Sequence, residues 1–252
     1  MKKLFTLIAL FALTVVATAQ TENVYLWKNG TFTTYPLSEI DSITFALPNA
    51  TDEEPDNTSS EVVAVDLGLP SGTLWADRNI GANSPEDYGD LFAWGETKTK
   101  ELYIWDNYKF RDSSNEKLTK YCTNSSDGTV DNKTTLEAED DAATANWGND
   151  WCMPTNEQLL ELRRKCKWEW TTLNNVAGYN ITGSNGISIF LPAASHHDIG
   201  GYTEKSSCYW SSTLQSSSCA YEVWFNSEEV GDVVYCSRWI GLSVRAVRSV
   251  TR

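Results

Sequence analysis

The sequence predicts an α+β protein, because two helical segments are followed by a run of short strands and do not alternate with them. The first helical segment, from Leu136 to Trp147, is rich in alanine and has acidic residues crowded at its start. The second begins at Thr155, where Gln158 can complete a capping box. Between residues 187 and 247, short runs of aromatic and β-branched residues are separated by Ser, Asn and Gly, a pattern typical of antiparallel strands.

The helix after Thr155 has one apolar face. Leu159, Leu162 and Cys166 recur at helical spacing and form a single stripe. Three basic residues, from Arg163 to Lys165, occupy the last turn, where the helix macrodipole favours positive charge. We therefore expect this helix to bury its stripe against the strands.

The first 19 residues predict a signal peptide. A basic start is followed by an apolar core from Leu4 to Val16 and by a small-residue cleavage site, Ala17-Thr18-Ala19. The apolar run is shorter than the roughly 20 residues that span a membrane. The sequence therefore predicts a secreted protein without membrane insertion.

Two further regions precede the main domain. Residues 20–47 predict a small β unit, because Val24–Lys28 and Thr31–Tyr35 flank Asn29-Gly30, a strong hairpin signal. A third short strand is expected from Ile40 to Phe45. Residues 48–61 are acidic and polar and predict a linker, which leaves 62–252 as the main domain.

The charge excludes some classes of partner. The formal net charge is −14, and loss of Lys2 and Lys3 with the signal peptide makes it −16. Nucleic acids and anionic membranes both require a basic surface, so neither is an expected partner.

Signatures of catalysis are absent from the sequence. It contains no Gly-x-Ser-x-Gly, no phosphate-binding glycine loop and no His-Glu-x-x-His. The six cysteines include no Cys-x-x-Cys, which weighs against structural zinc and thioredoxin-type chemistry. We expect a protein that is not an enzyme.

Six motifs in order resemble a known family. They begin at Val65, Leu136, Trp151, Ile189, Tyr209 and Ser243, and read VDLGLPSGTLWA, LEAEDDAA, WCMPTNE, IFLPAA, YWSST and SVRAVR. Together they resemble the Fibrobacter succinogenes major paralogous domain of secreted gut-bacterial proteins, over roughly residues 62 to 248. The resemblance implies a C-type-lectin-like fold, with two helices and a curled antiparallel sheet that carries long loops. It also implies the periplasm or the outer surface of a Gram-negative bacterium. Cys152 departs from the family signature, which usually has Arg there.

Metal and cofactor signals are weak. The loop from Asn124 to Asp131 does not match an EF-hand register, but folds of this type sometimes bind calcium in loops. Asp127 and Asp131 are therefore the candidate ligands for calcium, and no other cofactor is expected. The pair His196-His197 lacks the i, i+4 spacing of two ligands on one helix face, and is expected to lie in a loop.

Aromatic residues give the better indication of function. The chain has eleven tryptophans, and exposed aromatic rings supply rigid contact area for sugars or proteins. In some lectin-like bacterial receptors of this group, the segment before the last strand is diversified to make a binding face, and here that segment is Gln215–Trp239. The expected ligand-binding residues are Tyr221, Trp224, Tyr235, Arg238, Trp239 and His196.

The same segment suggests a disulfide. If Asn226 to Glu229 forms a two-residue-loop hairpin turn, Cys219 lies opposite Cys236, close enough for a bridge. A shift of one residue in register would remove this pairing.

We therefore expect a non-catalytic binding protein that recognises an extracellular glycan or surface protein through its loops and C-terminal hairpin. Two alternatives remain open. One is a structural or adhesion component of the cell surface. The other is an enzyme of the sulfatase-modifying type, which would require a reactive cysteine.

Overall fold

The computed structural model describes residues 23–28, 31–36, 61–193, 195–198 and 201–249, and for 26–28, 195–198, 201–206 and 249 it describes the backbone alone. The expected signal peptide, the third strand of the N-terminal unit and most of the expected linker lie outside these residues. The chain divides into two compact units between Asn57 and Thr58, within the range expected for the linker.

The N-terminal unit contains a β-hairpin, as predicted. Strands β1 (Asn23–Lys28) and β2 (Thr31–Pro36) pair antiparallel, with Lys28 opposite Thr31, which leaves two residues for the turn. The rings of Tyr25 and Phe32 contact each other edge to face with centroids 5.5 Å apart, and both are exposed.

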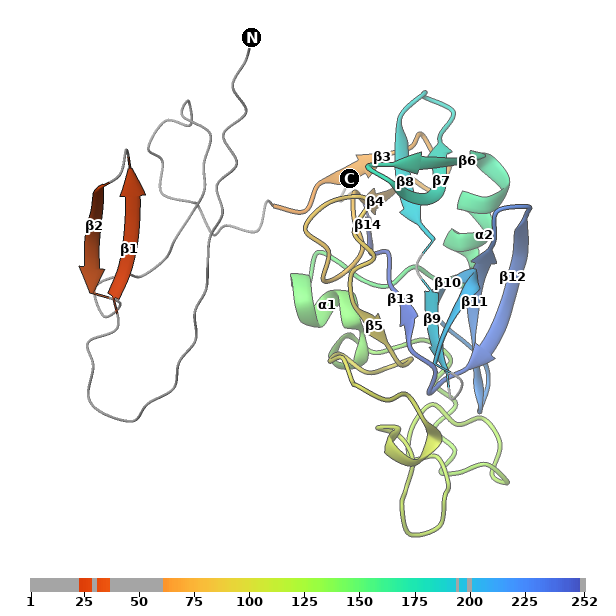
Figure 1. The fold of residues 1–252 in the computed structure, drawn as a ribbon. Helices are drawn as coiled ribbons and strands as arrows, with labels where there is room; N and C mark the ends of the chain where they lie inside the picture. Colours follow the sequence, from red (N-terminus) through yellow and green to blue (C-terminus); the bar gives the residue numbers. More distant parts are fainter. Residues whose placement is uncertain (1–22, 29–30, 37–60, 194, 199–200, 250–252) are drawn as a thin grey trace, which may run out of the picture. The chain divides into compact units, whose positions relative to one another are not determined.

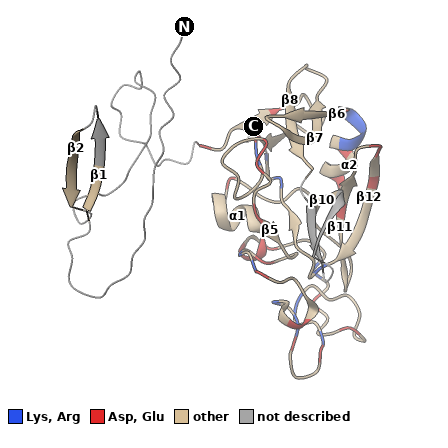
Figure 2. Cartoon of the chain, viewed as in Figure 1, with Lys and Arg blue, Asp and Glu red and all other residues tan. Residues whose placement is uncertain are grey.

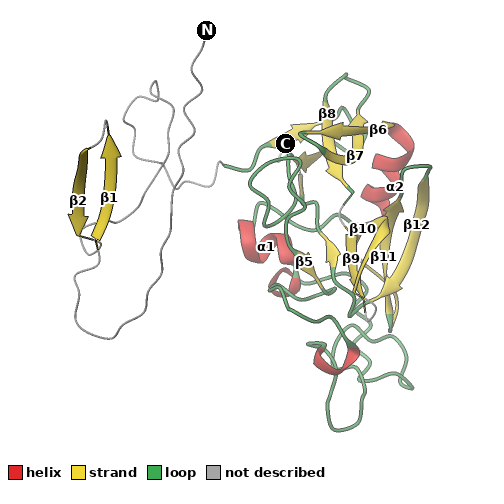
Figure 3. Ribbon diagram, viewed as in Figure 1, coloured by secondary structure: helices red, strands yellow, loops and turns green. Residues whose placement is uncertain are grey.

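The second unit has an α+β fold with two α-helices and three open, mostly antiparallel sheets (Figures 1 and 3). Its helices are α1 (Ala142–Trp147) and α2 (Asn156–Lys165), and short 3₁₀ turns occur at Trp105–Asn107 and Ala138–Asp140. The strands are β3 (Ala64–Asp66), β4 (Thr73–Ala76), β5 (Leu91–Phe92), β6 (Lys167–Leu173), β7 (Val176–Thr182), β8 (Ser188–Pro192), β9 (Ser195–Asp198), β10 (Gly201–Ser216), β11 (Cys219–Phe225), β12 (Val230–Ser237), β13 (Leu242–Ser243) and β14 (Val247–Ser249).

The largest sheet is built around the C-terminal half of the chain. Its order is β12-β11-β10-β13-β5, and β9 also pairs with β10. The pairing of β10 through β12 is antiparallel as expected, but β13 joins β10 in parallel, so the last predicted strand is not part of a simple meander. A second sheet has the order β14-β4-β3, and a third has the order β6-β7-β8.

Helix α2 begins as its sequence predicts. The Thr155 hydroxyl accepts a hydrogen bond from the Gln158 amide (3.3 Å), and the Gln158 side chain accepts one from the Thr155 amide (2.8 Å). Leu159 and Leu162 are buried, and α2 packs against β10, β11 and β12.

The other predicted helix is shorter than expected. The carboxylate of Asp141 accepts hydrogen bonds from the amides of Ala143 and Thr144, so Asp141 is an N-cap with extended backbone. It therefore separates α1 from the 3₁₀ turn before it.

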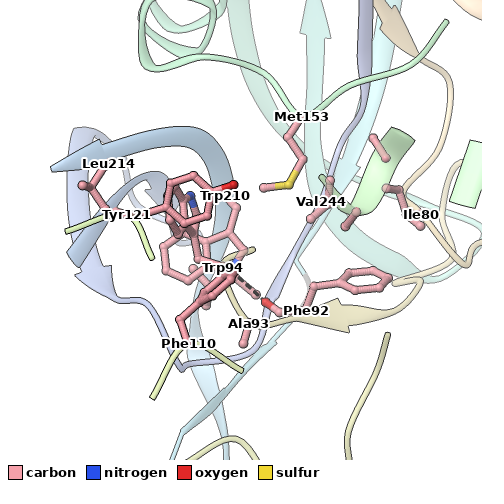
Figure 4. Packing of buried hydrophobic residues seen from close by; sticks show 14 of the residues in the cluster. Ile80, Phe92, Ala93, Trp94, Phe110, Tyr121, Met153, Trp210, Leu214 and Val244 are labelled. Carbon is pink, nitrogen blue, oxygen red and sulfur yellow. Dashed lines mark hydrogen bonds between the residues drawn. The ribbon is translucent and has the colours of Figure 1, made fainter. Parts of the chain in front are cut away.

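Two clusters of buried apolar side chains lie on opposite faces of the large sheet. The first is aromatic, with Trp94, Tyr121 and Trp210 packed together and the Trp210 indole N–H donating to the carbonyl of Phe92 (2.8 Å) (Figure 4). The second lies under α2 and includes Leu159, Tyr179, Val223 and Phe225. Among the described residues, no helix is long and apolar enough to cross a membrane.

Candidate functional site: a cleft at the C-terminal hairpin

A cleft of about 450 Å³ opens where three elements meet, and we call it the hairpin cleft. It lies between the end of α2, the β6–β7 hairpin and the turn that joins β11 to β12. Its lining residues are Arg163, Cys166, Trp168, Tyr179, Glu228, Glu229 and Val230.

Helix α2 supplies the basic side of the cleft. Its last turn carries Arg163, Arg164 and Lys165, visible as the blue end of α2 in Figure 2. The Arg163 guanidinium donates from Nη2 to the carbonyl of Val230 (2.9 Å) and from Nε to the carbonyl of Gly231 (3.3 Å). These two hydrogen bonds tie the helix to β12 and fix the guanidinium at the edge of the cleft.

The β6–β7 hairpin supplies the aromatic wall. The rings of Trp168 and Tyr179 contact edge to face with centroids 5.6 Å apart. The Trp168 indole N–H donates to the carbonyl of Leu162 (3.2 Å), and both rings pack on Phe225 beneath them. The wall is therefore held by the buried core and by the end of α2.

The β11–β12 turn supplies two carboxylates. The side-chain oxygen of Asn226 accepts hydrogen bonds from the amides of Glu228 (2.8 Å) and Glu229 (2.9 Å), and the Asn226 amide donates to the carbonyl of Glu229 (2.9 Å). Asn226 thus organises the turn, and both glutamates are exposed beside the aromatic wall.

The charges around the cleft act on its titratable groups. Burial raises the pKa of the Tyr179 hydroxyl, the positive charge of Arg163 lowers it, and the negative charge of Glu229 raises it. Burial and the charge of Glu161 raise the pKa of the Cys166 thiol to about 11. Cys166 is therefore a neutral thiol at physiological pH and is not an activated nucleophile.

The thiols of Cys152 and Cys208 behave alike. Burial and the charge of Asp141 raise the pKa of Cys152 to about 11. Burial and Glu222 raise the pKa of Cys208 well above its usual value. None of these three positions therefore resembles the electropositive environment of a reactive thiol.

The expected binding residues of the segment 215–239 do not form one site. Tyr221 stands opposite Tyr235 on one face of the β11–β12 pair, where Tyr235 is 59% exposed. Trp224 lies on the other face, half-buried against the first core, with its indole over Gly231. Trp239 is also half-buried, and its ring contacts that of Trp105 with centroids 5.2 Å apart.

Arg238 is not a surface contact, contrary to expectation. Its side chain is fully buried and donates to the hydroxyl of Tyr108 and to the carbonyls of Lys120, Tyr121 and Ser217. Because no ligand at the surface can reach it, its role is structural. His196 and His197 do not lie in a loop as expected, because their backbone pairs with β10 as part of β9. The side chain of His196 is outside the described part of the structure.

The expected disulfide between Cys219 and Cys236 is wrong. A bulge between Val223 and Phe225 shifts the β11–β12 register by one residue, so Cys219 faces Ser237 and Cys236 faces Ala220. The two side chains point to opposite faces of the sheet. All six cysteines are described, and all six are free.

The candidate calcium ligands have other partners. The Asp131 carboxylate accepts hydrogen bonds from the amides of Tyr121, Cys122 and Lys133, which outweigh the effect of burial and lower its pKa. Asp127 is exposed, and its side chain accepts a hydrogen bond from the Ser126 hydroxyl (3.0 Å). Both hydrogen-bonding patterns are those of loop structure.

In the described part of the chain, one group of three potential ligands has the spacing of a metal site. It consists of Glu137, Glu139 and Asp140. Lys109, Lys120 and Lys133 form ion pairs with this group at 2.5 to 2.8 Å. Since three lysines already neutralise three carboxylates, the group does not need a cation.

Sequence reasoning missed the residues that form most of the hairpin cleft, because it assigned no strands between residues 167 and 182. The sequence signal for this hairpin was the pair Asn174-Asn175, which lies between segments that contain Trp168, Trp170 and Tyr179. Both asparagines have positive φ (47° and 69°), which suits a tight hairpin turn.

Comparison of the chain with models of known protein families, with curated proteins and with solved structures found no match in any of the three.

Proposed function

We propose that this protein is a secreted or cell-surface binding protein without catalytic activity, that its main domain is C-type-lectin-like, and that the hairpin cleft binds a glycan. One observation carries the proposal: an aromatic wall, two exposed carboxylates and a fixed guanidinium converge on one cleft. The family resemblance of the six sequence motifs supports the same class of protein.

The chemistry of the cleft suits a sugar. A pyranose ring has an apolar C–H face and a rim of hydroxyls, each of which both donates and accepts hydrogen bonds. The part-exposed ring of Trp168 is the apolar group that the cleft presents to the face of such a ring. The carboxylates of Glu228 and Glu229 accept from hydroxyls, and these charge-assisted hydrogen bonds are strong.

The cleft is also organised before any ligand binds. Arg163 is tied to β12, Trp168 to the end of α2, and the turn is held by Asn226. A site whose side chains are already ordered loses less conformational entropy on binding. The hairpin cleft therefore supports binding without a large rearrangement.

The same residues do not support glycoside hydrolysis. That reaction requires two carboxyl groups that flank the scissile bond, one of them an acid whose pKa is raised by its environment. Glu228 and Glu229 are adjacent on one exposed turn. We therefore assign them to hydroxyl recognition.

A protein partner is the second candidate, favoured by a different surface. Tyr221 and Tyr235 face each other across β11 and β12, and Tyr235 is more than half exposed. Paired tyrosines on a rigid hairpin resemble the contacts of protein-binding surfaces. The Tyr235→Ala variant therefore serves as a control for glycan binding and as a probe of this alternative.

Affinity electrophoresis tests the proposal directly. Native gels would contain arabinoxylan, galactomannan, hydroxyethylcellulose or soluble starch, all of them neutral. We expect at least one polysaccharide to retard the wild-type protein and the Tyr235→Ala variant, but not the Glu228→Gln/Glu229→Gln double variant. Both glutamates are exposed, so their substitution leaves the fold intact. Retardation by none of the four, or equal retardation of the double variant, would contradict the proposal.

A further inference from the structure

The aromatic wall of the hairpin cleft continues beyond it along β6. Side chains two residues apart on a strand point to the same face, so Trp168 and Trp170 lie side by side. Tyr179 stands opposite Trp170 on β7, and its ring contacts both indoles, with centroids 5.6 Å from Trp168 and 5.1 Å from Trp170. Tyr179 is buried between them. The three rings therefore form one row, which begins in the cleft and ends outside it.

Trp170 is the exposed end of this row. It is 37% exposed, whereas Trp168 is half-buried and lines the cleft. Strand β6 is the edge of the sheet β6-β7-β8, so no strand of that sheet covers this end. A single exposed tryptophan is ordinary on a protein surface. What distinguishes Trp170 is its packing on a ring that lines the cleft.

A hydroxyl extends the row further. Thr172 lies two residues beyond Trp170 on the same face of β6 and is exposed. The charged residues of β6, Lys167 and Glu169, lie on the opposite face and pair with each other at 2.8 Å. The row itself is therefore apolar, with a polar group at its far end.

The arrangement differs from that of a site for a single sugar. Positions two residues apart on a strand are offset by about 7 Å. Adjoining pyranose rings of one chain can contact both indoles, whereas one ring seated in the cleft cannot.

We propose that the hairpin cleft and Trp170 are adjoining subsites for one oligosaccharide chain, so that the ligand is a segment of at least two linked sugars and not a single terminal sugar. This inference rests on the proposed function, because it assumes that the cleft binds a glycan. Trp168 and the two glutamates bind one unit, and Trp170 stacks on the next.

Calorimetric titration with sugars of increasing length tests this inference. The probes are the glucose, xylose and mannose series, each from the monosaccharide to the β-1,4-linked tetrasaccharide. For the wild type we expect affinity to rise about tenfold or more between monosaccharide and trisaccharide, equivalent to about 1.4 kcal/mol. Trp170→Ala should abolish this rise, and Trp170→Phe should restore part of it. Tyr235→Ala is the matched exposed-aromatic control and should behave as the wild type.

The outcomes separate the two proposals. Binding that does not depend on length, or a length dependence that survives Trp170→Ala, overturns the inference and leaves glycan binding in the cleft intact. Absence of binding by every sugar in all three series overturns the inference, and glycan binding itself is overturned only if no polysaccharide retards the protein in the gels.

Discussion

The hydroxyl of Tyr179 donates a hydrogen bond to the backbone carbonyl of Asn226 (3.1 Å) and thereby joins two hairpins that are 47 residues apart in the sequence. Tyr179 belongs to the aromatic row, and Asn226 organises the turn that carries Glu228 and Glu229. This contact therefore contributes, together with the hydrogen bonds of Arg163 to β12, to the position of the carboxylates relative to the rings.

Removal of that hydroxyl tests its role. Tyr179→Phe keeps the ring packing but loses the hydrogen bond, which contributes about 1 kcal/mol to a typical fold. We expect the urea midpoint to fall accordingly and the retardation in polysaccharide gels to weaken, because the turn is no longer held to the wall. A variant as stable as the wild type would show that packing alone positions the turn.

The pH dependence of stability should reveal a buried carboxyl group. Glu222 is 6% exposed, and its Oε2 atom has no hydrogen-bond partner among the described residues. Burial raises its pKa from 4.5 to about 7, although a hydrogen bond from Cys208 opposes the shift. The folded state thus favours the protonated form. The stability that protonation confers is fully present below pH 4.5 and is lost as the pH rises to about 7.

Glu222→Gln removes this titration. Relative to the wild type, the variant should gain stability between pH 4.5 and pH 7, by roughly 3 kcal/mol at most. Urea unfolding at pH 4.5, 6 and 8 measures the difference, and Glu228→Gln on the exposed turn is the control. Parallel pH profiles for wild type and Glu222→Gln would contradict the assignment.

Arg238 should prove to be a stability residue. Its guanidinium lies within 4.9 to 5.8 Å of four aromatic rings, those of Trp94, Tyr108, Phe110 and Tyr121. A lysine ammonium cannot make the same fork of hydrogen bonds, so Arg238→Lys should lower the free energy of unfolding by about 3 kcal/mol or more. Arg248→Lys, which alters a contact with one ring, should cost less than about 1 kcal/mol. An equal loss of unfolding free energy in the two variants would contradict this role of the buried Arg238 guanidinium and its four rings.

The β11–β12 register predicts the state of the cysteines. Protein purified without reductant, denatured and alkylated should yield modified Cys219 and Cys236 in peptide mapping, because these residues lie on opposite faces of the sheet. A peptide pair that links them would mean that the bulge on β12 opposite Trp224 is absent.

Calcium should not stabilise the protein. Lysines pair with all three carboxylates of the group Glu137, Glu139 and Asp140, so a cation would have to displace them. We expect the melting temperature to be the same in calcium and in EDTA. A rise that saturates with calcium would show a bound ion.

Local signals made much of the fold predictable. The capping box at Thr155, the stripe of leucines after it and the run of strands that contains β10, β11 and β12 could all be recognised from neighbouring residues. The N-terminal hairpin was equally visible from Asn29-Gly30.

The site was harder to predict because it depends on contacts between distant segments. A bulge at Gly231 and Asp232 on β12, opposite Trp224, moves the register by one residue. The isolated Gly231 is a local signal of a bulge, but it does not specify the pairing that results. The burial of Arg238 depends on rings more than 100 residues earlier in the chain. The aromatic row was missed because Trp168 and Trp170 follow a helix directly, without a turn signal before the strand.

Fluorine NMR gives the most direct test of the central claim, that the hairpin cleft binds a sugar chain. Protein labelled with 5-fluorotryptophan would show resonances for Trp168 and Trp170, assigned from the Trp168→Phe and Trp170→Phe variants. Addition of the tetrasaccharide that binds in calorimetry should shift both resonances with one saturation curve and leave that of Trp94 in the buried core unchanged. Unchanged Trp168 and Trp170 resonances at a saturating concentration of sugar would contradict the account.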